Sequence, residues 1–338
     1  MFRVRNRTEL ETRNTKQINK MEKPYVIGMD MGGTNTVFGI VDARGNVISK
    51  SAIKTNTHDD VNLYINDLHV EMSKLIDAAG GIDKIKGIGV GAPNGNYYTG
   101  NIEFAPNLPW KGVIPFAKLM TEKFGVPAAL TNDANAAAFG EMTYGAAHGM
   151  KNFIMITLGT GVGSGIIIDG KVVYGHDGFA GELGHVNVMR NNGRLCGCGR
   201  SGCLEAYASA TGVARSAREI LESSNKASLL RNIPIDSITS KDVFDAAMEG
   251  DEVGKEIFNF TGRILGEAFS DFVAFSAPEA IVLFGGLSKA GDMILNPIIE
   301  NMEKNILPIW KGKVKVLFSD LKEADAAVLG ASALAWEL

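Results

Sequence analysis

The sequence lacks any long, strongly apolar run. A membrane-spanning helix needs about 20 such residues, and the longest uncharged stretch of interest, 153–168, is broken by repeated glycine and threonine. The basic segment 1–24 has no apolar core of the kind that a secretory signal carries, and its glutamates do not suit a mitochondrial presequence. We therefore expect a cytoplasmic protein that does not associate with membranes.

Cysteine and net charge are also scarce. The chain of 338 residues has three cysteines, all between Cys196 and Cys203, which do not make the disulfide framework of a secreted protein. Its 34 basic and 38 acidic residues give a net charge of −4, which argues against general nucleic-acid binding. The length exceeds one compact core of the commonest size and suits two lobes.

Apolar periodicity predicts alternating strands and helices. Short apolar runs bounded by turns predict strands, and apolar residues at helical spacing predict helices. The strands are expected at 25–30, 36–42, 47–51, 85–90, 128–131, 153–157, 165–169, 171–174 and 280–284. The helices are expected at 61–79, with Leu63 among its apolar positions, and at 115–124, 134–141, 255–276, with Phe275 on its apolar face, 290–304 and 324–336. This alternation indicates an α/β sheet in each half of the chain.

The two halves share a pattern of a strand, a glycine-rich turn and a second strand. An offset of 127 residues aligns Asp30 with Thr157, Gly32 with Gly159, and Asp42 with Asp169. Such an internal match predicts two related α/β units.

The first glycine-rich turn follows a strand that ends in an aspartate. Glycines let backbone N–H groups approach a phosphate closely, and Asp30 can hold Mg²⁺ through water. An ordinary hairpin turn is the alternative. The residues expected to contact the phosphates or the Mg²⁺ of a nucleotide are Asp30, Gly32, Gly33, Thr34 and Asn35.

The second turn, 158–165, has glycine at every other position with hydroxyls between. It is neither a P-loop, because no Gly-Lys-Ser/Thr follows, nor a dinucleotide-binding fingerprint. We expect Thr160 and Gly161 to contact the remaining phosphates, because this loop offers N–H donors without side-chain bulk. Two such turns at matching offsets would face each other across a cleft.

The three cysteines follow a histidine at metal-ligand spacing. His185, Cys196, Cys198 and Cys203 offer three thiolates and one imidazole, which is the ligand set of a closed, structural zinc site. The alternative is three free cysteines in a glycine-rich loop. Because the phosphate-binding turns are expected elsewhere in the fold, the metal is expected to support this loop and not those turns.

Carboxylates and amides gather near these loops, as recognition of vicinal hydroxyls requires. The set comprises Asn107, Asn132, Asp133, Glu182, His185 and Glu205. Asn132 or Asp133 is expected to cap the following helix, and capping is the plain alternative role of Asp133. The zinc loop would position Glu205 and Glu182.

Together these segments resemble the ROK family of repressors and sugar kinases from about Tyr25 to the C-terminus. Segment 182–185 is similar to the family's E-x-G-H motif, and 196–205 to its zinc signature C-x-C-G-x-x-G-C-x-E. Segments 30–34 and 158–165 are similar to its two phosphate motifs, and Gly285-Gly286 resembles its adenosine-side loop. The loop 91–95 departs from the family's usual Pro-Gly-Pro form, so we assign no sugar contact there.

The resemblance implies an α/β fold of two actin-like ATPase (ribonuclease H-like) lobes around a cleft, with a small zinc-binding loop. It implies ATP, Mg²⁺ and a structural Zn²⁺, with Asp133 as catalytic base, Gly286 on the adenosine side and the polar set on the sugar. The smaller lobe would comprise 25–133 with 324–338, and the larger lobe 134–323. Residues 1–24 are expected to be a disordered, largely dispensable leader. A homodimer is expected, with a tetramer as the alternative.

The expected function is therefore phosphorylation of a hexose by ATP. Asp133, ionised at neutral pH and favoured in that form by a helix N-terminus, would accept the hydroxyl proton. Glucose, phosphorylated at O6, is the expected substrate because the polar set is similar to that of the family's glucokinases. N-acetylmannosamine, N-acetylglucosamine or fructose are the alternatives. A DNA-binding repressor is the rival class, but only about 24 residues precede the first strand, too few for a helix-turn-helix domain.

Overall fold

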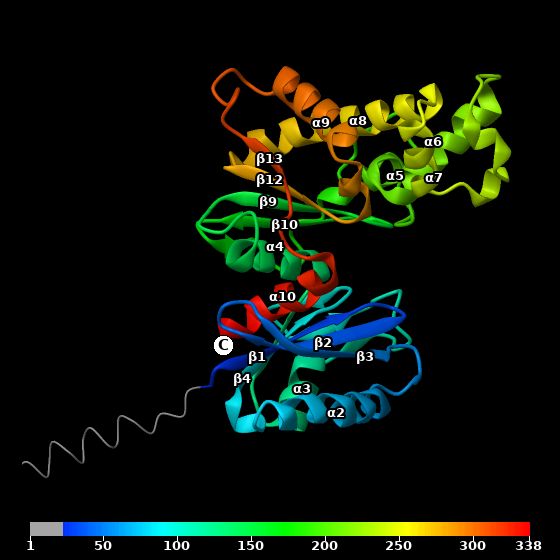
Figure 1. Cartoon of the computed structure of the whole chain (residues 1–338). Coiled ribbons are helices and arrows are strands. Elements are labelled where there is room, and N and C mark those ends of the chain that lie inside the picture. Colours follow the sequence, from blue (N-terminus) through cyan, green and yellow to red (C-terminus); the bar gives the residue numbers. More distant parts are fainter. Residues whose placement is uncertain (1–22) are drawn as a thin grey trace, which may run out of the picture.

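The computed structural model describes residues 23–338, apart from the side chains of residues 323 and 324, and the predicted leader lies almost entirely outside this range. Two five-stranded sheets lie one above the other, with helices between and outside them (Figure 1). Within the described part of the chain, no helix is both long and apolar enough to cross a membrane.

The first sheet has the strand order β3-β2-β1-β4-β8. Strand β1 pairs antiparallel with β2 and parallel with β4, and β4 pairs parallel with β8. Its outer face is covered by α2 (Val61–Ala78) and α3 (Phe116–Phe124) (Figure 1). The strands are β1 (Tyr25–Met31), β2 (Asn35–Asp42), β3 (Val47–Lys54), β4 (Ile85–Gly91) and β8 (Ala128–Thr131).

The second sheet repeats this topology in the order β11-β10-β9-β12-β13. Strand β9 pairs antiparallel with β10 and parallel with β12, as β1 does with β2 and β4. Helices α8 (Glu252–Ser276) and α9 (Asp292–Asn305) pack on its outer side. The strands are β9 (Phe153–Leu158), β10 (Val162–Ile168), β11 (Lys171–Val172), β12 (Ala280–Phe284) and β13 (Lys315–Phe318). The predicted internal repeat is therefore confirmed.

Two helices, α4 (Asp133–Tyr144) and α10 (Glu323–Trp336), lie between the sheets (Figure 1). Glycines allow α10 to approach both neighbours closely. A Cβ at Gly28 of β1 would lie 2.0 Å from the Val328 carbonyl oxygen, and a Cβ at Gly140 of α4 would lie 2.9 Å from the Cα of Gly330. Helix α10 thus packs backbone to backbone on the first sheet and on α4.

Further elements lie between strands of the same sheet in each half, and periodicity did not predict them. A small sheet is built from β5 (Gly95–Asn96), β6 (Asn101–Glu103) and β7 (Val113–Ile114). Three helices follow the cysteine loop, namely α5 (Glu205–Ala208), α6 (Ala210–Ser223) and α7 (Ser240–Met248). The 3-10 turns are η1 (Ile82–Lys84), η2 (Leu183–His185), η3 (Leu229–Asn232), η4 (Ile235–Ser237) and η5 (Gly286–Ala290).

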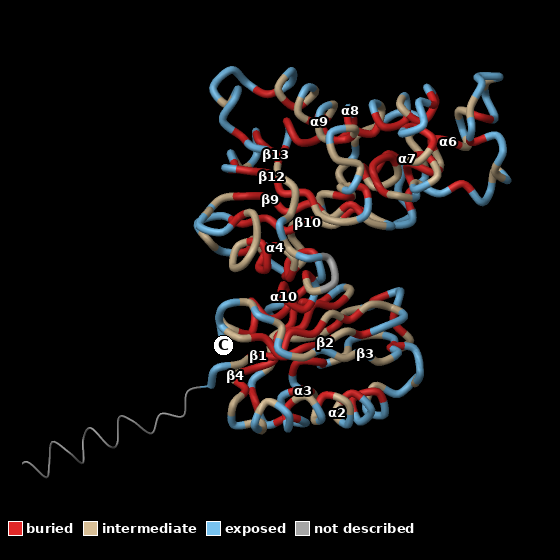
Figure 2. Tube along the Cα trace, in the orientation of Figure 1, coloured by how far each residue is buried: buried red, intermediate tan, exposed pale blue. Residues whose placement is uncertain are grey.

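Buried residues, red in Figure 2, follow both sheets and the helices that cover them. Two predicted core positions are wrong. Leu63 is 50% exposed because α2 turns Tyr64 and Leu68, four residues apart, toward the sheet instead. Phe275 is on the expected face of α8 but lies in its last turn, which no described element covers, and it is 79% exposed.

Candidate functional site

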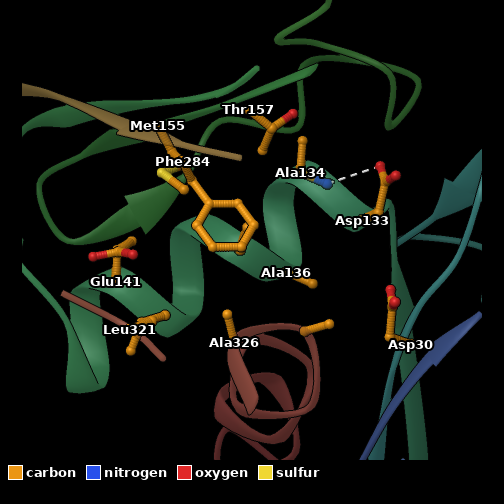
Figure 3. A pocket seen from close by; sticks show the side chains of 12 residues that line it. Asp30, Asp133, Ala134, Ala136, Glu141, Met155, Thr157, Phe284, Leu321 and Ala326 are labelled. Carbon is orange, nitrogen blue, oxygen red and sulfur yellow. Dashed lines mark hydrogen bonds between the residues drawn. The ribbon is translucent and has the colours of Figure 1, made fainter. Parts of the chain in front are cut away.

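Two aspartates lie close together at the meeting of the first sheet with α4. Asp30 is near the end of β1, and Asp133 is the first residue of α4. A Cβ placed on Gly91 of β4 would lie 3.1 Å from the Cβ of Ala136 and 3.7 Å from both Asp30 Oδ1 and the Cα of Asp133, so this glycine lets α4 pack close to β4 beside the two carboxylates. Both carboxylates line a pocket with about 640 Å³ of open space, and Thr157 lies on its far side (Figure 3).

At the start of α4, one residue caps the helix and the next one faces the pocket. Asn132 is the N-cap, and its Oδ1 accepts the N–H of Asn135 at 2.7 Å. Asp133 accepts the adjacent N–H of Ala134 at 2.9 Å, and its carboxylate faces the pocket (Figure 3). Asn132 therefore does the capping, and Asp133 is available for chemistry.

Burial in the cleft raises the pKa of both aspartates. Desolvation raises the pKa of Asp133, although the residue as a whole is in contact with solvent. Desolvation, with the negative charge of Asp133 in second place, raises the pKa of Asp30 to about 6. The helix N-terminus was expected to favour the ionised form of Asp133 and so to lower its pKa, but desolvation outweighs that effect. A higher pKa makes a carboxylate a better proton acceptor near neutral pH.

The first glycine turn adjoins Asp30. Its Gly32 N–H donates to the Asn35 carbonyl at 2.9 Å, and Thr34 and Asn35 are exposed. A Cβ at Gly33 would lie 2.6 Å from the Asn107 carbonyl oxygen. The loop that carries Asn107 therefore rests on this turn, which brings one predicted sugar contact beside the predicted phosphate contacts.

The second glycine turn is fastened by the start of α6. The Gly159 carbonyl accepts the N–H of Ala210 at 2.8 Å, and the Thr160 carbonyl accepts the hydroxyl of Thr211 at 3.0 Å. The turn is closed by the Gly159 N–H, which donates to the Gly161 carbonyl at 3.0 Å. The turn is shorter than predicted, because β10 already begins at Val162.

The loop Gly285-Gly286 lies against this second turn. Gly285 has φ +108°, which favours glycine, and a Cβ there would lie 2.6 Å from the Leu158 carbonyl oxygen. Gly286 is exposed and has open space around it. The structure therefore brings Gly286 close to the turn of Thr160 and Gly161.

Thr157 is a pocket residue that sequence reasoning used only to align the repeat. It ends β9 as Asp30 ends β1, and its Oγ1 accepts the N–H of Gly163 at 3.0 Å. The offset of the internal repeat already pairs it with Asp30, and that signal could have identified it.

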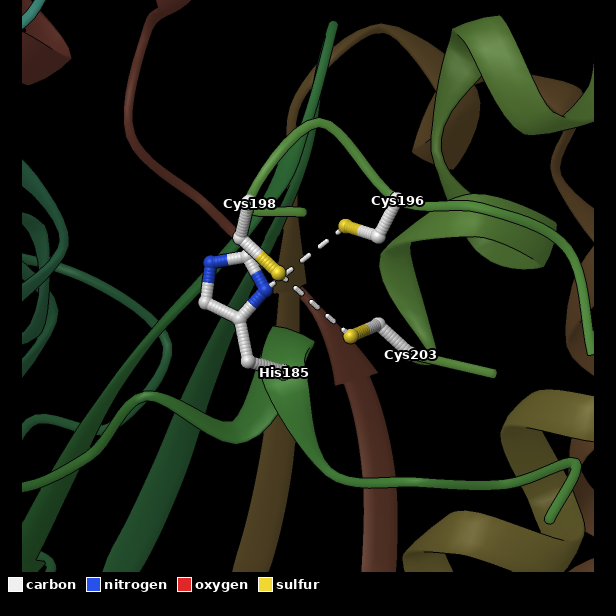
Figure 4. Close-up of side chains that lie close together, drawn as sticks. All are labelled: His185, Cys196, Cys198 and Cys203. Carbon is white, nitrogen blue, oxygen red and sulfur yellow. Dashed lines mark hydrogen bonds between the residues drawn. The ribbon is translucent and has the colours of Figure 1, made fainter. Parts of the chain in front are cut away.

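The four predicted metal ligands form one cluster (Figure 4). Their sulfur and ring-nitrogen atoms all lie within 4.8 Å of one another. Cys196 Sγ is 3.8 Å from His185 Nδ1, and Cys198 Sγ is 3.7 Å from Cys203 Sγ, so the thiols are free. Three thiols and one imidazole at this spacing fit a tetrahedral zinc ion.

Glu205 links this cluster to the second glycine turn. Its Oε1 lies 3.4 Å from Cys196 Sγ, and its Oε2 accepts the N–H of Val162 at 3.0 Å. A Cβ at Gly161 would lie only 2.4 Å from that Oε2. The expectation that the nucleotide turns lie apart from the zinc loop is therefore wrong, because the cysteine loop folds back onto the first residues of β10.

Glu182 joins the same group of acidic side chains. Desolvation raises its pKa, His185 opposes that rise, and the charges of Asp133 and Glu205 add to it. Asp133, His185 and Glu205 thus lie within electrostatic reach of Glu182. Asn132 directly precedes Asp133 as the N-cap of α4, and the loop of Asn107 packs on the first glycine turn.

The chain matches known proteins along almost its whole length. The model of the ROK family matches residues 26–337. A glucokinase from Halalkalibacterium halodurans is 37% identical over 316 residues, 92% of this chain and 94% of the relative. A xylose repressor from Caldicellulosiruptor bescii is 30% identical over 322 residues, 94% of this chain and 79% of the repressor.

A solved structure supports the fold. The crystal structure of a ROK family glucokinase from Streptomyces griseus, in complex with glucose and AMPPNP, superposes with a TM-score of 0.75 at 32% identity. It covers 93% of this chain and 100% of that one. With the doubled sheet topology, this confirms the predicted pair of actin-like lobes. The motifs around the two glycine turns and the cysteine loop all fall within the matched range, and the chain belongs to the ROK family.

Proposed function

We propose that the protein is an ATP-dependent hexose kinase that phosphorylates the O6 hydroxyl of glucose. The observation that carries the proposal is the position of Asp133, a carboxylate with a raised pKa that lines one pocket with Asp30 and Thr157, the strand residues that lead into the two glycine turns. The glucokinase relatives, one of them solved with glucose and AMPPNP, support glucose as the sugar.

In this proposal the N–H groups of the two turns bind the nucleotide phosphates, and Gly286 lies on the adenosine side. Asn107, Asn132, Glu182, His185 and Glu205 orient the sugar by accepting from and donating to its hydroxyls. Asp133 accepts the proton of the attacking hydroxyl as the phosphoryl group is transferred. Mg²⁺ near Asp30 would neutralise charge on the phosphates when bound.

The cysteine cluster is proposed to hold a structural zinc ion. Zinc bound by His185, Cys196, Cys198 and Cys203 would leave no open position for catalysis. Its contribution would be to fix the loop that presents Glu205 and Glu182. The lobe boundaries at 133/134 and 323/324, the homodimer or tetramer, and the cytoplasmic location remain predictions.

The proposal is tested by a coupled assay with MgATP and a panel of glucose, N-acetylglucosamine, N-acetylmannosamine and fructose. We expect glucose to have the highest kcat/KM. A higher kcat/KM for another sugar would replace glucose as the assigned substrate and leave the assignment as a kinase in place. Failure to phosphorylate any of them would contradict the kinase proposal.

The relationship to a xylose repressor gives a second candidate, a sugar-responsive DNA-binding regulator. A gel-shift assay with the operator of a neighbouring sugar operon separates the two. The kinase proposal predicts no sugar-dependent shift.

A further inference from the structure

Ser164 is a buried hydroxyl group that no step above uses. It is the third residue of β10 and is 3% exposed. Its Oγ donates to the carbonyl of Gly181 and accepts the N–H of Leu183 at 3.0 Å. One side chain therefore bonds to the residues on both sides of Glu182.

The loop around Glu182 depends on such a contact for its shape. Gly181 has φ +93°, a left-handed conformation, and Glu182 is the N-cap residue that directly precedes the 3-10 turn η2. A Cβ at Gly184 would lie 2.0 Å from the Val162 carbonyl oxygen, so the loop rests directly on β10. The two hydrogen bonds of Ser164 hold the loop against β10 and thereby set the distance between Glu182 and that strand.

We propose that Ser164 is a positioning residue that aims the Glu182 carboxylate at the sugar. The inference rests on the proposed function, because Glu182 is assigned there to a sugar hydroxyl. The hydrogen bonds of Ser164 go to the 181–183 loop, whereas the turn at 159–161 is fastened by Ala210 and Thr211. Loss of the Ser164 hydroxyl should therefore weaken sugar binding and leave nucleotide binding largely unchanged.

The test is steady-state kinetics of Ser164→Ala with both substrates varied. Two lost hydrogen bonds should raise KM for the sugar about ten-fold, while KM for ATP changes less than about two-fold. The matched control is Ser270→Ala, a buried serine of α8 that donates to the Glu267 carbonyl away from the cleft. It should leave both KM values near those of the wild type.

A double-mutant cycle with Glu182→Gln distinguishes positioning from general damage. If Ser164 acts through Glu182, Ser164→Ala should change the sugar KM much less in the Glu182→Gln background. Ser164→Cys, which keeps the shape and a weak donor, should fall between serine and alanine, and it serves if the alanine variant does not fold.

Three results overturn the inference while the kinase proposal stands: an unchanged sugar KM, equal rises in both KM values, or strictly additive effects in the cycle. A wild-type protein that phosphorylates no sugar overturns the proposed function, and this inference with it.

Discussion

Asp30 is a carboxylate whose negative charge is disfavoured by folding. Its pKa in the folded chain is about 6, against an ordinary value of 3.8, because burial and Asp133 both disfavour its charge. The folded state therefore binds a proton more tightly than the unfolded state does. Stability is lost as pH rises through this window, and the full penalty is present above it.

We predict that Asp30→Asn stabilises the ligand-free protein at pH 7 by at most about 3 kcal/mol, since a shift of about two pKa units corresponds to that energy. Near pH 4 the gain should disappear, because Asp30 is then protonated in the folded state. Thermal unfolding without MgATP at both pH values measures this.

The matched control for Asp30→Asn is Asp242→Asn, for which we expect the opposite change in stability. Hydrogen bonds from the Thr239 side chain and backbone lower the pKa of Asp242, so its ionised form is favoured in the folded protein. That variant should lose stability at pH 7. A loss of stability in Asp30→Asn at pH 7 would contradict the assignment of a penalty to its charge.

Single residues were predictable where chemistry forces a spacing. The cysteine cluster could be predicted because a tetrahedral metal requires four ligands, and all three cysteines of the chain lie within eight residues of one another. Ser164 could not be found in this way, because its role depends on a loop 17 residues later in the chain folding back onto β10.

At the scale of elements, the cysteine loop and the second glycine turn form one unit through Glu205. We predict that Cys198→Ser loses the bound zinc and raises KM for both the sugar and ATP, several-fold each. The physical reason is that Glu205 fixes the N–H of Val162 at the end of the turn. Metal analysis of the purified variant, paired with kinetics for both substrates, measures the two effects.

Leu195→Ala is the control for Cys198→Ser, because this exposed side chain belongs to the same loop but is not a ligand. It should retain the metal. A Cys198→Ser variant that loses zinc with an unchanged KM for ATP would contradict the link through Glu205.

The long elements were predictable because their apolar patterns are regular. Helix α8 and strands β1, β2, β9 and β12 lie within a few residues of their expected positions. The small sheet of β5, β6 and β7 was not, because strands of two or three residues have no measurable period. The same holds for α5, which has only four residues. Its N–H groups bond to the carbonyls of Cys203 and Leu204, which directly precede it.

At the scale of the whole molecule, the crossing of α4 and α10 joins the two sheets. Gly140 and Gly330 meet there without side chains, and the buried Glu141 accepts the hydroxyl of Ser319, which leads from β13 toward α10. Small residues at a helix crossing permit the close packing seen here. Any movement of one sheet relative to the other would have to change the contact between α4 and α10.

We predict that Gly140→Ala destabilises the protein by about 1–3 kcal/mol, the usual cost of overpacking, because its Cβ would lie 2.9 Å from the Cα of Gly330 and backbone cannot yield as a side chain can. Chemical denaturation measures the change. Thr143→Ala, one turn along the same helix, should cost less than about 1 kcal/mol. Equal stability of Gly140→Ala and the wild type would show that the helices can separate freely at this point.

The doubled architecture was predictable from one offset of 127 residues, which carries β1 onto β9 and β2 onto β10. The relative placement of the two sheets was not, because it depends on the glycine contacts of α10, some 300 residues after β1. Periodicity reports which face of an element is buried but not which partner covers it.

The central claim, that Asp133 in the cleft drives phosphoryl transfer from ATP to a hexose, is tested most directly by comparing Asp133→Asn with the wild type. The measurement is kcat for glucose phosphorylation, with glucose binding followed by calorimetry. The amide keeps the shape but cannot accept the proton, so we predict a loss in kcat of at least about 10²-fold with glucose binding retained. An Asp133→Asn protein that turns over at a near-native rate would contradict the account and direct attention to Glu182.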